Sequence, residues 1–160
     1  MLARHRPACA AILCLTATQV WAGDLAVTAG AAEAVALPRT AHLGVYPYAA
    51  VSVVLPYDHV SVVPGLGLEY SPDTGHWGFV GTVVFDVPIT ATLGGDVIVA
   101  VAHDQAGGQW RDAQLLVGGG LGVSIATKQI VTSPSICIYS TVGSTTAWSL
   151  VPGISVSHVF

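Results

Sequence analysis

Long stretches of two-residue alternation are the feature of this sequence that most limits its fold. In the clearest stretch, HVSVVPGLGLEYS (59–71), mainly apolar residues alternate with mainly small or polar ones. The pattern returns in later stretches, at 76–87, 93–101, 113–125, 130–138 and 148–160. A period of two residues is typical of a β-strand whose two faces meet different surroundings. The chain is therefore predicted to be all-β.

The number of strands depends on the segment that precedes this series. Residues 41–55 are a plausible strand, whereas residues 24–36 are rich in alanine and are almost equally compatible with a helix. With residues 24–36 the count is eight strands, and without them it is seven. The prediction adopts eight.

The length of the strands and the order of the breaks favour a membrane barrel. Strands of 11 to 14 residues exceed the usual length of about 5–6 in soluble sheets, and match tilted membrane strands of about 9–11 residues with their ends. Breaks at 56–58, 88–92 and 126–129 alternate with breaks at 71–75, 104–109 and 140–146. With eight strands, both termini of the chain are expected on the first side, as in an outer-membrane barrel. The predicted fold is an antiparallel up-and-down transmembrane β-barrel.

The composition agrees with a protein surface that largely does not face water. Charged residues make up 9% of the chain, whereas soluble domains carry about 25%, and the mean hydropathy is +0.67. The formal charge of −4 argues against a nucleic-acid partner, because phosphate binding needs clustered Lys and Arg.

The N-terminus has the three-part layout of a secretory signal peptide. A basic start (4–6) precedes an apolar stretch (8–20) that is too short to cross a bilayer as a helix. We expect cleavage after Ala22, which gives a signal peptide at 1–22 and a barrel domain at 23–160. A buried N-terminal helix is the alternative. Of the three cysteines, only Cys137 follows the expected cleavage point.

Aromatic residues gather near the predicted ends of the strands. Aromatic side chains prefer the two membrane interfaces, so two aromatic girdles are expected of a transmembrane barrel. The alternative is that they are core residues of a soluble sandwich. The predicted girdle consists of Tyr46, Tyr70, Trp77, Phe85, Trp110, Tyr139 and Trp148.

The inward face carries few polar residues. Its predicted polar members are Glu69, Asp86, Asp96 and Gln114, among Gly, Ser, Ala and Val. Buried carboxylates need partners, yet no Lys or Arg falls mid-strand on this face. The carboxylates could lie near the wet ends, could be protonated, or could face water in the lumen.

The final residues, VPGISVSHVF, alternate up to a terminal phenylalanine. They resemble the C-terminal signature of small bacterial outer-membrane β-barrel proteins, of the eight-stranded OmpA-like or OmpX-like kind. Ile154, Val156 and Phe160 fit that pattern, whereas His158 stands where an aromatic or apolar residue is commoner. The resemblance implies insertion into outer-membrane lipid by the barrel assembly machinery, which recognises this strand. It implies nothing about a specific ligand.

Candidate chemical sites are weakly marked. Asp73, His76, His103 and Asp104 fall at the outer rim, but their spacing matches no metal-ligand motif. Ser71 and His76, with Glu69 or Asp73 as an orienting acid, could form a catalytic group, although nothing marks a strained nucleophile turn. We therefore predict no metal, no cofactor and no enzymatic activity.

Three functions remain open at this point. The first is a non-catalytic outer-membrane barrel with a structural or surface-interaction role. The second is a narrow, porin-like channel for water or small solutes, which the small residues of the lumen suggest. The third is an exported soluble β-sandwich that acts as a binding module. Membrane fractionation separates the third from the others, and conductance separates the first two.

Overall fold

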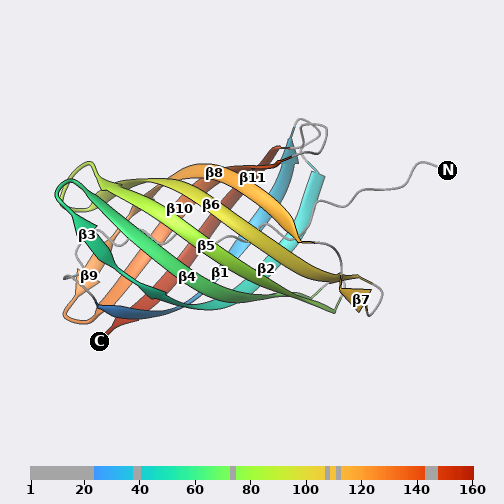
Figure 1. Ribbon diagram of the computed structural model, residues 1–160, viewed down its shortest axis with the longest axis horizontal. Helices are drawn as coiled ribbons and strands as arrows, with labels where there is room; N and C mark the ends of the chain where they lie inside the picture. Colours follow the sequence, from blue (N-terminus) through green and yellow to red (C-terminus); the bar gives the residue numbers. More distant parts are fainter. Residues whose placement is uncertain (1–23, 38–40, 73–74, 107–108, 111–112, 143–147) are drawn as a thin grey trace.

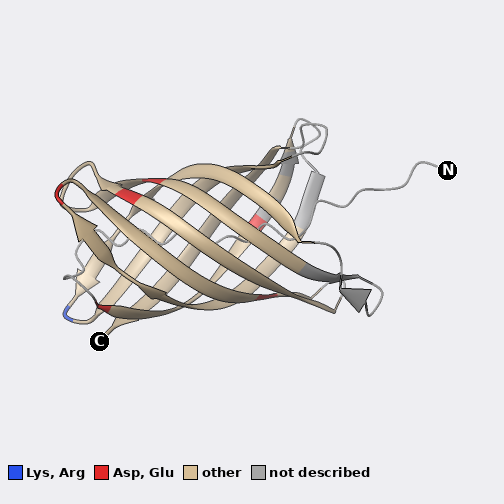
Figure 2. Ribbon diagram, in the orientation of Figure 1, with Lys and Arg blue, Asp and Glu red and all other residues tan. Residues whose placement is uncertain are grey.

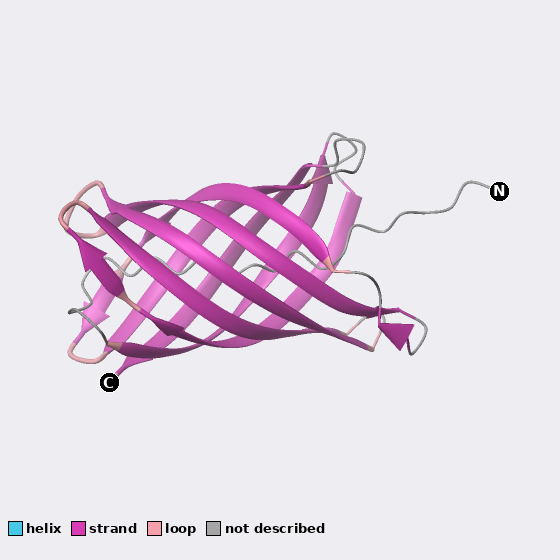
Figure 3. Cartoon of the chain, in the orientation of Figure 1, coloured by secondary structure: helices cyan, strands magenta, loops and turns pink. Residues whose placement is uncertain are grey.

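The chain forms a closed antiparallel barrel of eight strands, seen in a computed structural model (Figure 1). The structure describes residues 24–37, 41–72, 75–106, 109–110, 113–142 and 148–160. The predicted signal peptide lies outside the described residues. Within them the chain consists of strands and loops (Figure 3), with no helix long and apolar enough to cross a membrane.

Ten strand segments make up the eight strands of the barrel wall, which we call staves, and β7 is an additional short segment. β3 continues β2 beyond Val54, β9 continues β8 beyond Ser124, and β7 is a short segment paired with the end of β6. The bounds are β1 (Leu25–Leu37), β2 (Ala41–Val53), β3 (Leu55–Tyr57), β4 (Val60–Ser71), β5 (His76–Pro88), β6 (Leu93–Ala106), β7 (Gln109–Trp110), β8 (Gln114–Val123), β9 (Ile125–Thr127), β10 (Ile130–Thr141) and β11 (Trp148–Val159).

The alanine-rich segment at the start is the first strand, and it closes the barrel. β1 pairs with β2 on one side and with β11 on the other, from Ala26 opposite Val159 to Leu37 opposite Trp148. The register with β2 shifts between Ala34 and Val35. Hydrogen bonding on both edges outweighs the weak strand preference of alanine, because strand preference depends strongly on context. The predicted count of eight strands is confirmed.

The two ends of the barrel differ in their connections. We call the end with the turns at 58–59, 89–92 and 128–129 the short-turn end, and the opposite end the loop end. Asp58 and Lys128 have φ angles of 43° and 57° in two of these turns. At the same end the Phe160 amide donates a hydrogen bond to the Leu25 carbonyl at 3.0 Å, so the first strand begins beside the last residue.

Burial alternates along the strands, as the sequence pattern predicts. In β5 buried positions from Gly78 to Asp86 alternate with outward-facing ones. Inward side chains such as Val84 and Ile98 are 0% exposed, whereas the outward Leu66 is 74% exposed. The eight-stranded barrel is just wide enough for its inward side chains to fill.

Candidate functional site

The loop half of the interior is filled by aromatic and aliphatic side chains. Tyr46, Tyr48 and Tyr139 belong to one buried cluster with Val80, Leu116 and Val151. Bare glycine backbone makes room for two of the rings. An added Cβ at Gly30 would lie 2.6 Å from Tyr48 Cζ, and one at Gly118 would overlap Tyr139 Cδ1. The glycine run at 118–120 therefore serves close packing within a strand.

This packing corrects part of the predicted aromatic girdle. Tyr46 is 5% exposed and Tyr139 is 1% exposed, so both rings face the interior and not lipid. Nearness to a strand end predicts where along the barrel axis an aromatic ring lies. Whether the ring faces the interior or the lipid depends on whether its residue takes an inward or an outward position in the two-residue alternation. Tyr46 shares its parity with the buried Ala50, and Tyr139 shares its parity with the buried Cys137.

The other predicted girdle residues differ in exposure. Trp77, Phe85 and Trp148 have exposed side chains on the outer face, and Tyr70 is half-buried. The rings of Tyr70 and Trp77 pack with centroids 4.8 Å apart. Trp77 and Trp148 lie toward the loop end, and Phe85 lies toward the short-turn end. The side chain of Trp110 lies outside what the structure describes.

Hydroxyl groups line one side of the interior in the short-turn half. Thr28 Oγ1 and Ser157 Oγ are 2.8 Å apart, which joins β1 to β11 through a side-chain hydrogen bond. Ser124 Oγ and Ser133 Oγ are 3.3 Å apart, and Ser155 Oγ donates to the Ser133 carbonyl at 3.4 Å. These bonds satisfy buried polar groups across the strands that close the barrel.

Three of the four predicted lumen residues are buried in the interior. Asp86 is 1% exposed, Asp96 is 5% exposed and Glu69 is also buried, while Gln114 is half-buried. The Glu69 side chain lies over bare backbone at Gly78, where an added Cβ would be 3.0 Å from Oε1. Charged residues are sparse on the described strands (Figure 2).

The rim does not assemble the metal group considered from the sequence. His76 shares the inward parity of Val80, whereas His103 shares the outward parity of Val101, so the two imidazoles belong to opposite faces of the wall. Asp73 and the side chain of Asp104 lie outside the described residues. Among the residues that the structure describes, no three His, Cys, Asp or Glu side chains group as metal ligands.

The catalytic group considered from the sequence is only partly brought together. Ser71 and His76 are register partners on β4 and β5, with Glu69 two residues before Ser71. All three share the inward parity, and Ser71 is buried. A buried serine on a regular strand lacks the exposed, strained turn that presents a nucleophile to a substrate.

The three apolar residues of the predicted assembly signal face outward. Ile154, Val156 and Phe160 are exposed, while Ser155 between the first two is buried. The His158 and Phe160 rings lie 4.4 Å apart at an angle of 51°. His158 therefore forms an aromatic pair with the terminal residue, at a position where the resemblance leads us to expect an apolar or aromatic side chain.

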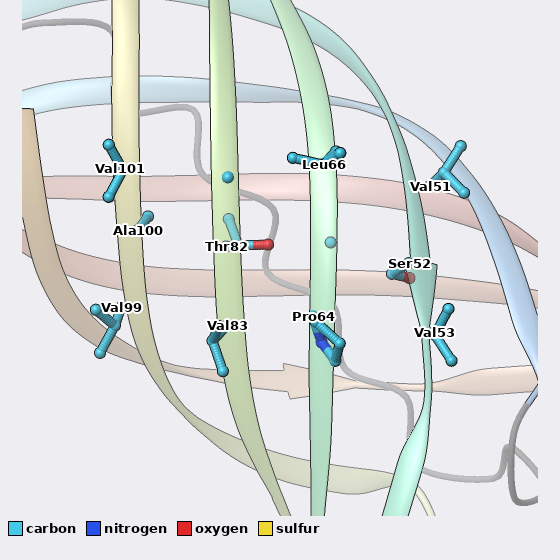
Figure 4. Close-up of a pocket in the computed structure, with 12 residues that line it drawn as sticks. Val51, Ser52, Val53, Pro64, Leu66, Thr82, Val83, Val99, Ala100 and Val101 are labelled. Atoms are coloured by element: carbon cyan, nitrogen blue, oxygen red, sulfur yellow. The ribbon is translucent and has the colours of Figure 1, made fainter. Parts of the chain in front are cut away.

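A shallow apolar groove of about 630 Å³ crosses the outer face of β2, β4, β5 and β6 (Figure 4). Its floor includes Gly81, where an added Cβ would meet only Leu66 Cδ2, at 3.7 Å. The sequence signal for it is a glycine at an outward position between the outward-facing Phe79 and Val83. The lining residues are Val51, Ser52, Val53, Pro64, Gly65, Leu66, Gly81, Thr82, Val83, Val99, Ala100 and Val101.

Closure, strand number and an apolar outer wall together define the fold of eight-stranded outer-membrane β-barrels. No protein-family model and no curated protein sequence matches the chain. Solved structures similar to it include two bacterial surface barrels and a designed transmembrane barrel. Neisserial surface protein A is 17% identical, with a TM-score of 0.55, over 86% of this chain and 99% of its own.

Two further structures have the same fold with less sequence identity. The N-terminal β-barrel domain of OprF from Pseudomonas aeruginosa is 11% identical, with a TM-score of 0.57, over 87% of this chain and 98% of its own. A de novo designed transmembrane β-barrel is 8% identical, with a TM-score of 0.52, over 89% of this chain and 99% of its own. At these identities the likeness establishes the fold and no specific activity.

Proposed function

We propose that this chain is a small outer-membrane barrel with a structural or surface-interaction role, and that it catalyses no reaction. The signal peptide at 1–22 directs its export, and the barrel assembly machinery inserts it into outer-membrane lipid. The single observation that carries the proposal is the two-sided wall. Its outer face exposes apolar side chains on every stave, and its inner face buries its own side chains.

The outer face is suited to lipid and not to water. Monomeric soluble proteins rarely expose continuous apolar patches of more than a few hundred Å², whereas Leu66, Val97, Ile136 and Ile154 are exposed on different staves of this barrel. In hydrocarbon every backbone amide and carbonyl needs an internal partner, and a closed barrel supplies it. This face supports the membrane location over the soluble β-sandwich.

The filled interior supports the structural role over the channel. Tyr48, Leu116 and Tyr139 are buried side chains that occupy the loop half of the lumen. A continuous water path through the barrel would have to pass between these side chains, because the interior of an eight-stranded barrel is just wide enough for side chains to fill.

Fractionation of the expressed protein tests the location. We expect it in the outer membrane, with a band in detergent gels that migrates differently before and after heating, because a closed barrel stays folded until it is heated. A periplasmic protein with no such band would instead indicate a soluble sandwich.

Conductance tests the role of the interior. In planar bilayers we expect the wild-type barrel to leave the current at the empty-membrane baseline. The double variant Leu116→Ala and Tyr139→Ala removes two buried side chains and should raise the current, and Trp148→Ala on the outer face is the matched control. Stepwise currents through the wild type would support the channel and contradict the filled interior.

Deletion of Phe160 tests the terminal strand as an assembly signal. The shortened chain should accumulate unfolded in the periplasm, because it lacks the exposed aromatic residue at the end of β11. Immunoblots of membrane and periplasmic fractions measure this, with Trp148→Ala, which removes an exposed aromatic side chain from the other end of β11, as the control. Full insertion without Phe160 would contradict the assigned role.

A further inference from the structure

A row of oxygen-bearing residues crosses three neighbouring strands on the inner wall. Ser61 on β4 is the register partner of Asp86 on β5, and Asp86 is the partner of Asp96 on β6. Ser61 shares the inward parity of the fully buried Val63. Directly opposed residues on one face of an antiparallel sheet have Cβ atoms about 4.5–5.5 Å apart. The two carboxyl groups are therefore immediate neighbours.

Among the described residues, no Lys or Arg side chain lies in the interior beside this acid pair. Asp86 Oδ1 and both carboxyl oxygens of Asp96 are buried without a hydrogen-bond partner. Lys128 is the one Lys or Arg within the described ranges, and it is exposed in a turn at the short-turn end. On the far side of Asp96 the partner residue is Gly120, which has no side chain to offer. Buried carboxylates in such surroundings need a positive charge, either from protons or from a bound cation.

The chemistry of the row selects the kind of ion that would supply this charge. The side chains offer oxygen atoms only, and hard divalent cations prefer carboxylate, hydroxyl and water oxygens. Calcium binds such oxygens at about 2.3–2.6 Å in irregular geometry, so one ion can be shared by two neighbouring carboxylates. We propose that the Ser61, Asp86 and Asp96 row binds a hard divalent cation, such as Ca²⁺, inside the barrel. The remaining ligands are water molecules.

The test is a calorimetric titration of the full-length barrel in detergent with CaCl₂ at neutral pH. Since the row supplies only two charged ligands, we expect a dissociation constant of about 0.1–1 mM, as in weak calcium modules. Asp86→Asn and Asp96→Asn should each weaken binding by about tenfold or more, because the number of charged ligands sets the affinity. Asp58→Asn is the matched control, since it removes the same charge from an exposed turn.

Each outcome of the titration decides the matter. Saturable binding by the wild type and by Asp58→Asn, lost in Asp86→Asn and Asp96→Asn, supports the site. No binding by the wild type overturns it, and protons then neutralise the pair. Equal binding by all four proteins also overturns it, because the ions are then held by the surface or the detergent.

A second measurement keeps the proposal testable if a single variant fails to fold. Heated-gel unfolding of the wild type should need a higher temperature in CaCl₂ than in EDTA. The double variant Asp86→Asn and Asp96→Asn should show no such difference and should be more stable than the wild type in EDTA, because it lacks the repulsion between the acids. A wild type that is insensitive to EDTA would contradict the proposal.

Discussion

Gly118→Ala is expected to destabilise the folded barrel by about 3 kcal/mol, at the upper end of the usual range for overpacked interiors. A Cβ at this position would overlap the Tyr139 ring and the Ile138 carbonyl oxygen on the neighbouring strand. The ring is buried and the carbonyl is part of the backbone, so neither can move aside without disturbing β10. The expected sign is unusual, because alanine in a strand normally stabilises relative to glycine.

Urea unfolding of the refolded barrel in detergent, followed by gel mobility, measures this difference. Gly81→Ala is the matched control, because its added Cβ would meet only Leu66 Cδ2 at an ordinary 3.7 Å. That variant should be neutral or more stable by about 0.5–1 kcal/mol. If both variants change stability alike, the contact between Gly118 and Tyr139 is not the reason for the glycine.

Val99→Arg is expected to destabilise the barrel by about 2–4 kcal/mol, the range for a basic residue at the bilayer midplane. Val99 lies in the middle of β6, faces outward and is 36% exposed. An arginine there would bring an uncompensated charge into hydrocarbon, beside the apolar groove that Val99 lines. Unfolding is measured in lipid bilayers, because the expected loss applies to a charge at a bilayer midplane, which a detergent micelle lacks.

Val87→Arg is the control for depth in the membrane. Val87 also faces outward but lies one residue before the end of β5, at the short-turn end. There the expected loss falls to about 0–1 kcal/mol, because the side chain can reach the interface. Equal effects at the two positions would place Val99 outside the hydrocarbon.

The two-residue alternation predicts most of the fold, because each strand has one face toward the interior and one face toward the outside of the barrel. The predicted stretch 76–87 corresponds to β5 (His76–Pro88), and 59–71 contains β4 (Val60–Ser71). Residues 24–36 were ambiguous, since alanine marks neither face, and their strand state comes from pairing with β2 and β11. The metal site considered from the sequence placed His76 and His103 together because both lie near the rim. The alternation along β5 and β6 instead puts the two side chains on opposite faces of the wall.

The candidate site was harder to predict, because it depends on register. Asp86 and Asp96 were both expected in the lumen, but only the pairing of β5 with β6 makes them direct neighbours. The inward placement of Tyr139 likewise depends on bare backbone at Gly118, its partner on β8. A single sequence gives the face of a residue through its parity, whereas its cross-strand neighbour follows from the turns and the shear of the closed barrel.

The seam between β1 and β11 has a consequence for how the barrel folds. Among the described staves, the pairing of β1 with β11, with Ala26 opposite Val159, joins the first stave to the last. All the remaining pairings join staves that are consecutive in the chain. Contacts between residues so distant in sequence carry a large loop-closure entropy and slow folding. The side chains of β1 at this seam are mostly small, so little packing energy offsets that entropy until β11 is in place. The rate-limiting step of folding should therefore be the meeting of these two strands, after the hairpins between them have formed.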